Sequence, residues 1–161
     1  MHDAFGLCSG TTGIENEEQL SKDISIVYKK VAERYTEDKI IIAGYSIGSG
    51  FAAKLALENK PKALILQAPY YNFLELSSSR APFFPDFMKK FSLETNLYLP
   101  KINRPIYIFH GTKDQLIPID NSIRLKKLLK SNAYFYPLKN QEHIGVNENE
   151  DFQKQLKIIL Q

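Results

Sequence analysis

Residues 39–57, KIIIAGYSIGSGFAAKLAL, decide the fold of this chain. The apolar run from Lys39 to Ala43 predicts a buried strand, and the run from Phe51 to Leu57 predicts a helix. Between them lies Gly44-Tyr45-Ser46-Ile47-Gly48, and a serine in a sharp strand-to-helix turn is the context of a nucleophile elbow. We expect Gly44 and Gly48 to permit the close backbone approach of such a turn. A glycine-rich phosphate-binding turn is the alternative, but the chain has neither Gly-Lys-Ser/Thr nor Gly-x-Gly-x-x-Gly.

A serine hydroxyl needs a neighbouring base and an orienting acid to act as a nucleophile. Residues 105–110 predict a short parallel strand, and Asp114 follows it in a turn, where open α/β sheets place functional side chains. Residues 133–137 predict a last strand, and His143 lies in the polar loop after it. The predicted catalytic residues are therefore Ser46, Asp114 and His143.

Each of these assignments has a simpler alternative. Asp114 would also fit as a turn-forming aspartate, whose side chain bonds the nearby backbone, and His143 would also fit as a solvated loop histidine. His110, at the end of its strand, is expected to pack or to form hydrogen bonds there. A metal site built from His110, Asp114 and His143 is disfavoured, because two histidines and one carboxylate occur at such spacings by chance. We therefore expect no metal and no cofactor.

Several blocks of sequence resemble one family. They are Phe5-Gly6 with Ser9-Gly10, the elbow at 44–50, Leu64 to Tyr70, His110-Gly111-Thr112-Lys113-Asp114, and the His143 loop. Together they resemble the α/β-hydrolase superfamily, in particular the uncapped serine hydrolases that include protein depalmitoylases and bacterial relatives. The resemblance spans essentially the whole chain. It implies an α/β fold with Ser46 as nucleophile, Asp114 as acid and His143 as base.

The resemblance also implies an N-terminally truncated member. Relatives begin with four further strands and a His-Gly segment that supplies one oxyanion donor, whereas Met1 here already lies beyond the fourth strand. We expect a partial α/β-hydrolase fold of about four parallel strands with flanking helices, in which the backbone N–H of Ile47 is the one assignable oxyanion donor. The strand at 39–43 would form an exposed edge, through which the chain is expected to self-associate or to be poorly soluble.

Composition bounds the remaining function classes. With 43% hydrophobic and 24% charged residues in 161, we expect a single globular domain over residues 1–161. The formal charge of +3 is dispersed rather than gathered with aromatic residues, which argues against nucleic acid as a partner. One cysteine, Cys8, suits a reducing cytoplasm. No apolar stretch predicts a signal peptide or a membrane span, although an anchor or signal upstream of Met1 stays open.

The other segments follow from periodicity. Apolar residues from Leu20 to Tyr35 predict an amphipathic helix, another is expected after Pro118 with Asp120 or Asn121 as N-cap, and a last one near the C-terminus. The irregular stretch 70–100 would either form an apolar wall for an acyl chain or pack back on the sheet. The residues expected to line a substrate site are Tyr45, Tyr70, Phe83 and Phe84.

The sequence thus predicts a serine hydrolase acting on carboxylic esters or thioesters, with small acyl esters or acylated proteins as substrates. Two alternatives stay open. A peptidase of the same fold shares the triad, and an incomplete, non-catalytic hydrolase would need the missing strands or a partner in their place.

Overall fold

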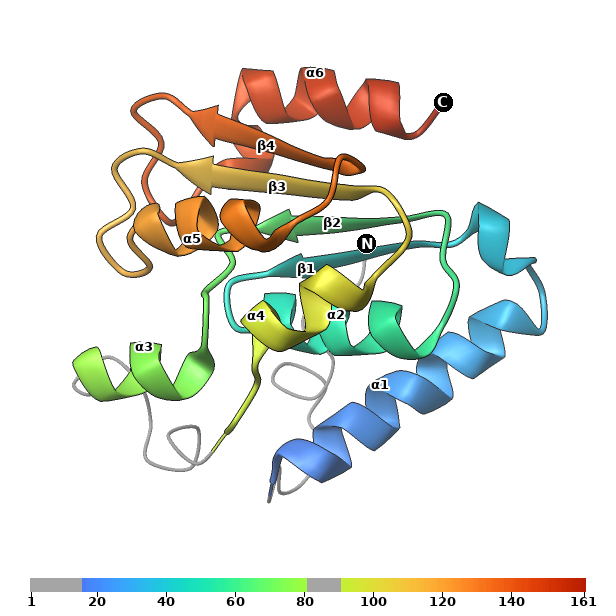
Figure 1. Cartoon of the computed structure of the whole chain (residues 1–161). Helices are drawn as coiled ribbons and strands as arrows, with labels where there is room; N and C mark the ends of the chain where they lie inside the picture. The colour runs from blue at the N-terminus through green and yellow to red at the C-terminus, as the bar shows by residue number, and fades with distance from the viewer. Residues whose placement is uncertain (1–15, 81–90) are drawn as a thin grey trace.

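A computed structural model describes residues 16–80 and 91–161 as one four-stranded parallel sheet flanked by helices (Figure 1). The strand order is β1-β2-β3-β4, so the strands lie in the order in which they occur in the chain. Their bounds are β1 Ile41–Tyr45, β2 Ala63–Gln67, β3 Ile106–Gly111 and β4 Ala133–Leu138. The expected α/β fold with about four parallel strands is therefore confirmed, and β1 begins two residues later than the sequence predicts because Lys39 ends a 3₁₀ turn.

Helices connect the strands. The elements are α1 Glu17–Ala32, η1 Glu37–Lys39, α2 Gly48–Glu58, α3 Phe73–Ser79, α4 Thr95–Tyr98, η4 Leu99–Lys101, α5 Asp120–Leu128, η5 Val146–Glu148 and α6 Glu150–Ile159. In Figure 1, α6 lies over one face of the sheet, and α2, α4 and α5 lie on the other. This is the layered arrangement that alternating strands and helices predict.

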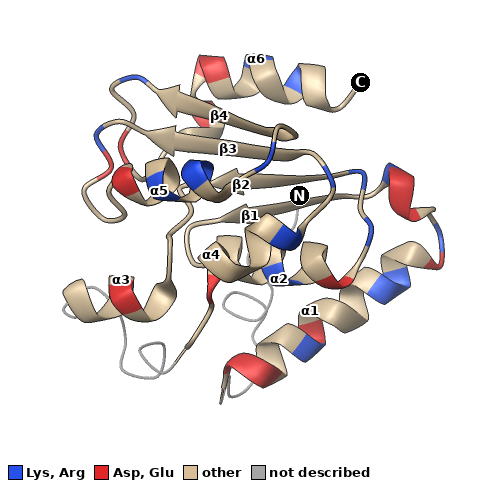
Figure 2. Ribbon diagram, viewed as in Figure 1, with Lys and Arg blue, Asp and Glu red and all other residues tan. Residues whose placement is uncertain are grey.

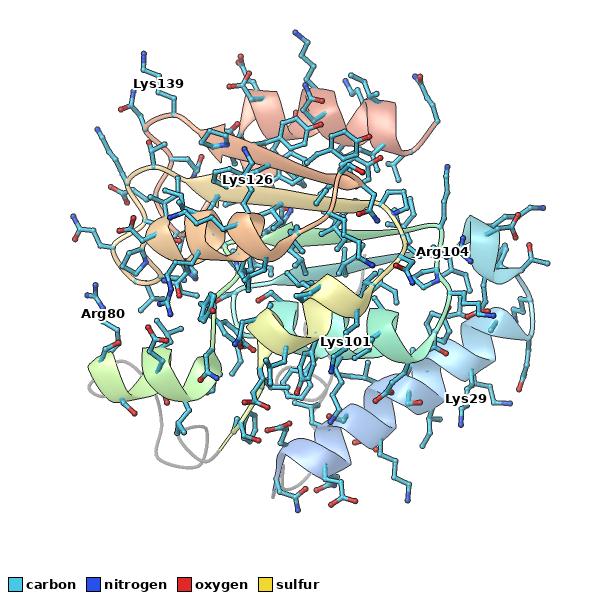
Figure 3. All side chains as sticks on the ribbon, in the orientation of Figure 1. Lys29, Arg80, Lys101, Arg104, Lys126 and Lys139 are labelled. Carbon is cyan, nitrogen blue, oxygen red and sulfur yellow. The ribbon has the colours of Figure 1, made fainter. Side chains whose placement is uncertain are left out.

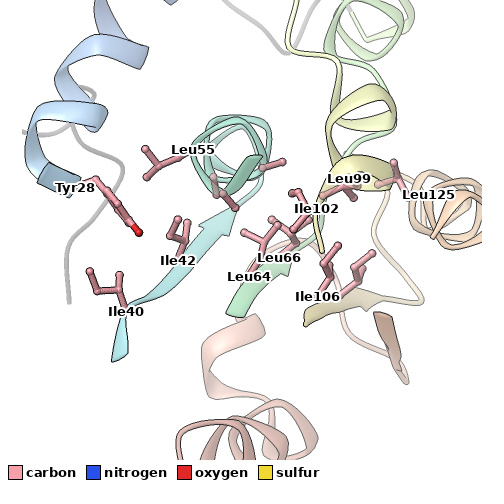
Figure 4. Close-up of a cluster of buried hydrophobic side chains, with 14 residues drawn as sticks. Tyr28, Ile40, Ile42, Leu55, Leu64, Leu66, Leu99, Ile102, Ile106 and Leu125 are labelled. Atoms are coloured by element: carbon pink, nitrogen blue, oxygen red, sulfur yellow. The ribbon is translucent and has the colours of Figure 1, made fainter. Parts of the chain in front are cut away.

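The core lies on both faces of the sheet. Side chains from alternate strand positions, among them Ile42, Leu64 and Ile106, pack with α1, α2 and α5 (Figure 4). On the opposite face Ile65 and Phe109 pack under α6. Because successive strand residues point to opposite faces, near-continuous apolar strands are what a sheet covered on both sides requires.

One helix start differs from the sequence prediction. Neither Asp120 nor Asn121 is the N-cap of α5, because Ile119 occupies that position and already has helical dihedrals. Asp120 is the first helical residue, where a negative charge suits the helix dipole. Asn121 has a tertiary role instead: its side chain donates to the Pro118 carbonyl and accepts the Tyr71 N–H.

Charged side chains avoid the sheet. Figure 2 shows the four strands free of Lys, Arg, Asp and Glu, with both signs of charge distributed over helices and loops. The long basic side chains, such as Lys29 on α1, Lys126 on α5 and Lys139 after β4, come from different elements (Figure 3). Within residues 16–80 and 91–161, no helix combines the length and apolar character needed to cross a bilayer.

Candidate active site

The predicted catalytic residues follow the carboxyl ends of three strands. Ser46 directly follows β1, Asp114 lies three residues after β3, and His143 lies in the loop after β4. In a parallel sheet all carboxyl ends point the same way, so side chains from distant parts of the sequence come together there. The structure brings the three predicted side chains together, with His143 in contact with both Asp114 and Ser46.

Ser46 sits in a strained turn between β1 and α2. Its φ of 52° is in the left-handed region, which a non-glycine residue rarely adopts, and its N–H donates to Gln67 O at 2.9 Å. A Cβ on Gly44 would lie 2.5 Å from Ala52 Cβ and 2.6 Å from Gly48 O, so this position requires glycine. The strain is held by the sheet on one side and the start of α2 on the other.

The second elbow glycine does not have the steric role that the sequence predicts. Among the described residues, apart from its chain neighbours and the nearby backbone of α2, no atom lies within 4 Å of a Cβ placed on Gly48, and its φ is not positive. The close approach occurs instead at Gly50, whose Cβ would overlap the Tyr70 hydroxyl and lie 3.0 Å from Leu93 Cβ. No local pattern identifies Gly50 as a sterically required glycine, because the residues that crowd it, Tyr70 and Leu93, are distant in the chain.

The three side chains form a continuous hydrogen-bonded chain. His143 Nδ1 lies 2.7 Å from Asp114 Oδ2, and His143 Nε2 lies 3.0 Å from Ser46 Oγ. A carboxylate accepts hydrogen bonds and does not donate them, so the proton of the neutral imidazole belongs on Nδ1. Nε2 is then free to accept from the Ser46 hydroxyl. This arrangement can take the proton from a serine as it attacks a carbonyl.

The Asp114 carboxylate is buried and well supplied with donors. Oδ1 accepts from the backbone N–H groups of Leu116 at 3.0 Å and Ile117 at 2.8 Å. Burial acts to raise the pKa of Asp114, but hydrogen bonds with His110, His143 and the Ile117 N–H outweigh it and hold that pKa well below its ordinary value. Asp114 is therefore a carboxylate at neutral pH, as an orienting acid must be.

His110 is fully buried behind this acid. Its Nε2 lies 2.7 Å from the Ile117 carbonyl and 3.4 Å from Asp114 Oδ2, and its Nδ1 lies 2.6 Å from Ser122 Oγ. Since a carbonyl only accepts, Nε2 carries the proton. The expectation that His110 forms hydrogen bonds at the end of its strand is confirmed. Within the described part of the chain no cluster of three or more His, Cys, Asp or Glu side chains could hold a metal ion.

Ile47, the predicted oxyanion donor, immediately precedes α2. Its carbonyl accepts from the Tyr70 hydroxyl at 3.2 Å, which anchors the peptide between Ile47 and Gly48, the one that follows the predicted N–H donor. Tyr70 is fully buried, and this burial raises its pKa well above the usual value, so the hydroxyl stays a donor. Tyr70 therefore belongs to the core beneath the elbow and not to an accessible substrate wall, contrary to the sequence expectation.

The other residues expected to line a substrate site divide in two. Tyr45 is 39% exposed beside the site, and its ring stacks on His143. Phe83 and Phe84 lie outside the described residues.

The helix α3, which opens the irregular stretch, is joined to α5 by a bidentate ion pair between Glu75 and Arg124. The Arg124 guanidinium also lies 3.7 Å from the ring centre of Tyr71.

The family assignment follows from comparison with known proteins. The protein family described as serine aminopeptidase, S33, matches residues 2–102. The chain belongs to this hydrolase family. The matched residues include β1, the turn at Ser46, α2 and β2.

Curated relatives agree with this assignment. The chain is 28% identical over 129 residues to alpha/beta hydrolase domain-containing protein 17C of Xenopus tropicalis and 29% identical over 120 residues to protein 17B of Homo sapiens. These alignments cover 77% and 71% of the chain but 39% and 40% of the two relatives. This S33-family chain therefore matches about two fifths of the length of these relatives.

Solved structures confirm the fold. An esterase of Pyrococcus furiosus superposes with a TM-score of 0.72 at 14% identity, covering 89% of this chain and 61% of the esterase. A serine hydrolase homologue of Coxiella burnetii superposes with a TM-score of 0.65 at 19% identity, covering 96% of this chain and 64% of that protein. At such identities the similarity shows that the S33-family chain has the α/β-hydrolase fold.

Proposed function

We propose that this chain hydrolyses carboxylic esters or thioesters through a Ser46-His143-Asp114 triad. The observation that carries the proposal is the unbroken chain of hydrogen bonds from Ser46 Oγ through the His143 ring to the buried Asp114 carboxylate. Membership of a hydrolase family and the strained turn at Ser46 support it.

In the proposed reaction Ser46 Oγ attacks the acyl carbonyl while His143 Nε2 takes its proton. Asp114 holds the Nδ1–H tautomer and stabilises the imidazolium that forms. The backbone N–H of Ile47 faces the negative charge that develops on the carbonyl oxygen, aided by the N-terminal end of α2. His143 then returns the proton to the leaving alcohol or thiol, and water repeats the sequence on the acyl-serine. Atoms and charges balance without a metal or cofactor.

The test uses a fluorophosphonate probe and a series of p-nitrophenyl and thioesters with short and long acyl chains. We expect labelling at Ser46, and loss of both labelling and turnover in Ser46→Ala with the fold retained. The matched control is Ser78→Ala, since Ser78 is exposed on α3 and bonds only the backbone of its own helix among the described contacts. Labelling at another serine with Ser46→Ala fully active would overturn the assignment.

Substrate class is a separate part of the proposal. Small acyl esters, thioesters and acylated proteins all carry the apolar acyl group that we infer. The aminopeptidase description of the matched family favours a peptidase as the second candidate. Aminoacyl amides with a free amino group distinguish the two, because a peptidase cleaves them and an acyl esterase does not. An inert chain with correct folding would instead support the non-catalytic alternative.

The position of β1 at the edge of the described sheet supports self-association as part of the proposal. Within the described residues β1 pairs only with β2. Ser46 N–H donates to Gln67 O, and Ile40 O accepts from Lys62 N–H, so the backbone groups of both residues point toward β2. Successive residues of a strand direct their backbone N–H and C=O groups alternately to the two sides, so those of Ala43 point away from β2. A second copy of the chain could pair there. A cytoplasmic location, which the single cysteine favours, completes the proposal.

A further inference from the structure

Tyr45 makes two contacts with the proposed base. It is the last residue of β1 and immediately precedes Ser46. Its hydroxyl donates to the backbone carbonyl of His143 at 2.7 Å, and its ring stacks on the imidazole with centroids 5.2 Å apart and an interplanar angle of 29°. One side chain therefore holds both the backbone and the ring of His143.

This double contact depends on the strain in the elbow. Neighbouring residues of a regular strand point to opposite faces, so Tyr45 and Ser46 could not both reach one residue from an extended strand. The φ of 52° at Ser46 turns the chain so that both side chains contact His143, with Ser46 Oγ 3.0 Å from Nε2. Residues 45 and 46 thus contact His143 at its backbone carbonyl, at the face of its ring and at Nε2.

Other contacts fix the histidine loop to different strands. Gln141 Nε2 donates to the Ile144 carbonyl at 2.7 Å, which braces the loop internally, and the Lys113 N–H donates to Gln141 O at 2.9 Å beyond the end of β3. Gln67 at the end of β2 donates to Asn147 Oδ1 at 2.9 Å. Tyr45 supplies a contact from β1, the strand that delivers the nucleophile.

We propose that Tyr45 is a positioning residue that fixes His143 relative to Ser46. The hydroxyl sets the backbone position of His143, and the ring sets the plane of the imidazole and covers one of its faces. The inference rests on the proposed function in that it assigns His143 the role of base. Burial raises the pKa of Tyr45, as do the nearby charges of Asp114 and Glu148, so its hydroxyl remains a donor at neutral pH.

Two variants separate the two contacts. Tyr45→Phe removes the hydroxyl and keeps the stacked ring, whereas Tyr45→Leu removes both. Tyr134→Phe is the matched control, because Tyr134 is also an exposed strand tyrosine stacked on another ring, that of Tyr107, but on β4 away from the elbow. All three should melt within a few degrees of the wild type, since these side chains are only half buried.

The first readout is independent of activity. In the NMR spectrum of ¹⁵N-histidine-labelled chain, the His143 Nδ1–H bonded to Asp114 gives a downfield signal, assigned by its absence in His143→Gln. We expect this signal to broaden in Tyr45→Phe and to disappear in Tyr45→Leu, with the signals of buried His110 unchanged. An unchanged His143 signal in both variants would overturn the inference, whether or not the chain is an active hydrolase.

The second readout is the rate of Ser46 labelling by the fluorophosphonate probe. Loss of one net hydrogen bond predicts a rate roughly 3- to 10-fold lower in Tyr45→Phe, and misplacement of the base predicts roughly 100-fold in Tyr45→Leu. With ester substrates the loss should fall on kcat more than on KM. If the wild type is not labelled, the proposed function fails while the NMR signals still decide the role of Tyr45. Labelling of both variants at the wild-type rate would contradict that role.

Discussion

Replacing Gly50 by alanine tests how the elbow is packed. Gly50 lies in the first turn of α2, and a Cβ there would overlap the Tyr70 hydroxyl, lie 2.8 Å from its Cζ and 3.0 Å from Leu93 Cβ. Both Tyr70 and Leu93 are fully buried, so neither can move aside into solvent. We expect the substitution to destabilise the chain, even though alanine is the better helix former.

The size of the effect follows from three contributions. Overpacking a rigid core costs about 2 kcal/mol. Displacing the Tyr70 hydroxyl from the Ile47 carbonyl costs about 1 kcal/mol more, and the helix preference of alanine over glycine returns about 1 kcal/mol. The net loss is about 2 kcal/mol, which for a chain of this size lowers Tm by roughly 4–8 °C.

The assay is thermal unfolding followed by circular dichroism, with urea unfolding as a second measure. Gly48→Ala is the matched control, because a Cβ there meets no described atom within 4 Å outside its chain neighbours and the nearby backbone of α2, and its Tm should not fall. In a Tyr70→Phe background the overlapping oxygen is gone, so Gly50→Ala should cost at least about 1 kcal/mol less. A Gly50→Ala chain as stable as the wild type would refute the packing argument.

Three further outcomes are expected. Gly111→Ala would place a Cβ in overlap with the Gln141 carbonyl and 2.8 Å from Glu142 O, which should shift the His143 loop. We expect ester hydrolysis to fall roughly 100-fold, and unaltered turnover would contradict this packing argument. Folding depresses the pKa of Asp114, so the ionised carboxylate stabilises the fold above its unfolded pKa near 3.9, and this stabilisation is lost as the pH falls below roughly 4. The stability of Asp114→Asn should therefore fall less steeply with acid than that of the wild type, and identical acid-unfolding profiles would contradict the role of this carboxylate. Ala43→Pro removes an N–H that points away from β2, so it should abolish concentration-dependent association in sedimentation velocity and keep the fold; a wild type monomeric at every concentration would contradict pairing through β1.

The sequence by itself predicted the sheet and the residues that follow the carboxyl ends of its strands. Hydrophobic periodicity and glycine positions are local signals, so the strands, the turn at Ser46 and the order Ser46, Asp114, His143 could be read without tertiary contacts. Each of the three residues follows a predicted strand, and the carboxyl ends of parallel strands lie on the same side of the sheet; the hydrogen bonds of 3.0 and 2.7 Å agree with that placement.

Only the tertiary structure decided which neighbours each of these residues has. Gly44 and Gly48 look equivalent in the motif. The two positions in this segment where packing requires a glycine are instead Gly44 and Gly50, because the side chain of Tyr70, twenty residues later in the chain, packs directly against Gly50. The sequence predicts Tyr45 as a substrate-lining residue, and only the structure shows that its hydroxyl also donates to the carbonyl of His143, 98 positions later. Such contacts depend on how β1, α2 and the histidine loop are placed in space, and no local pattern of residues encodes that placement.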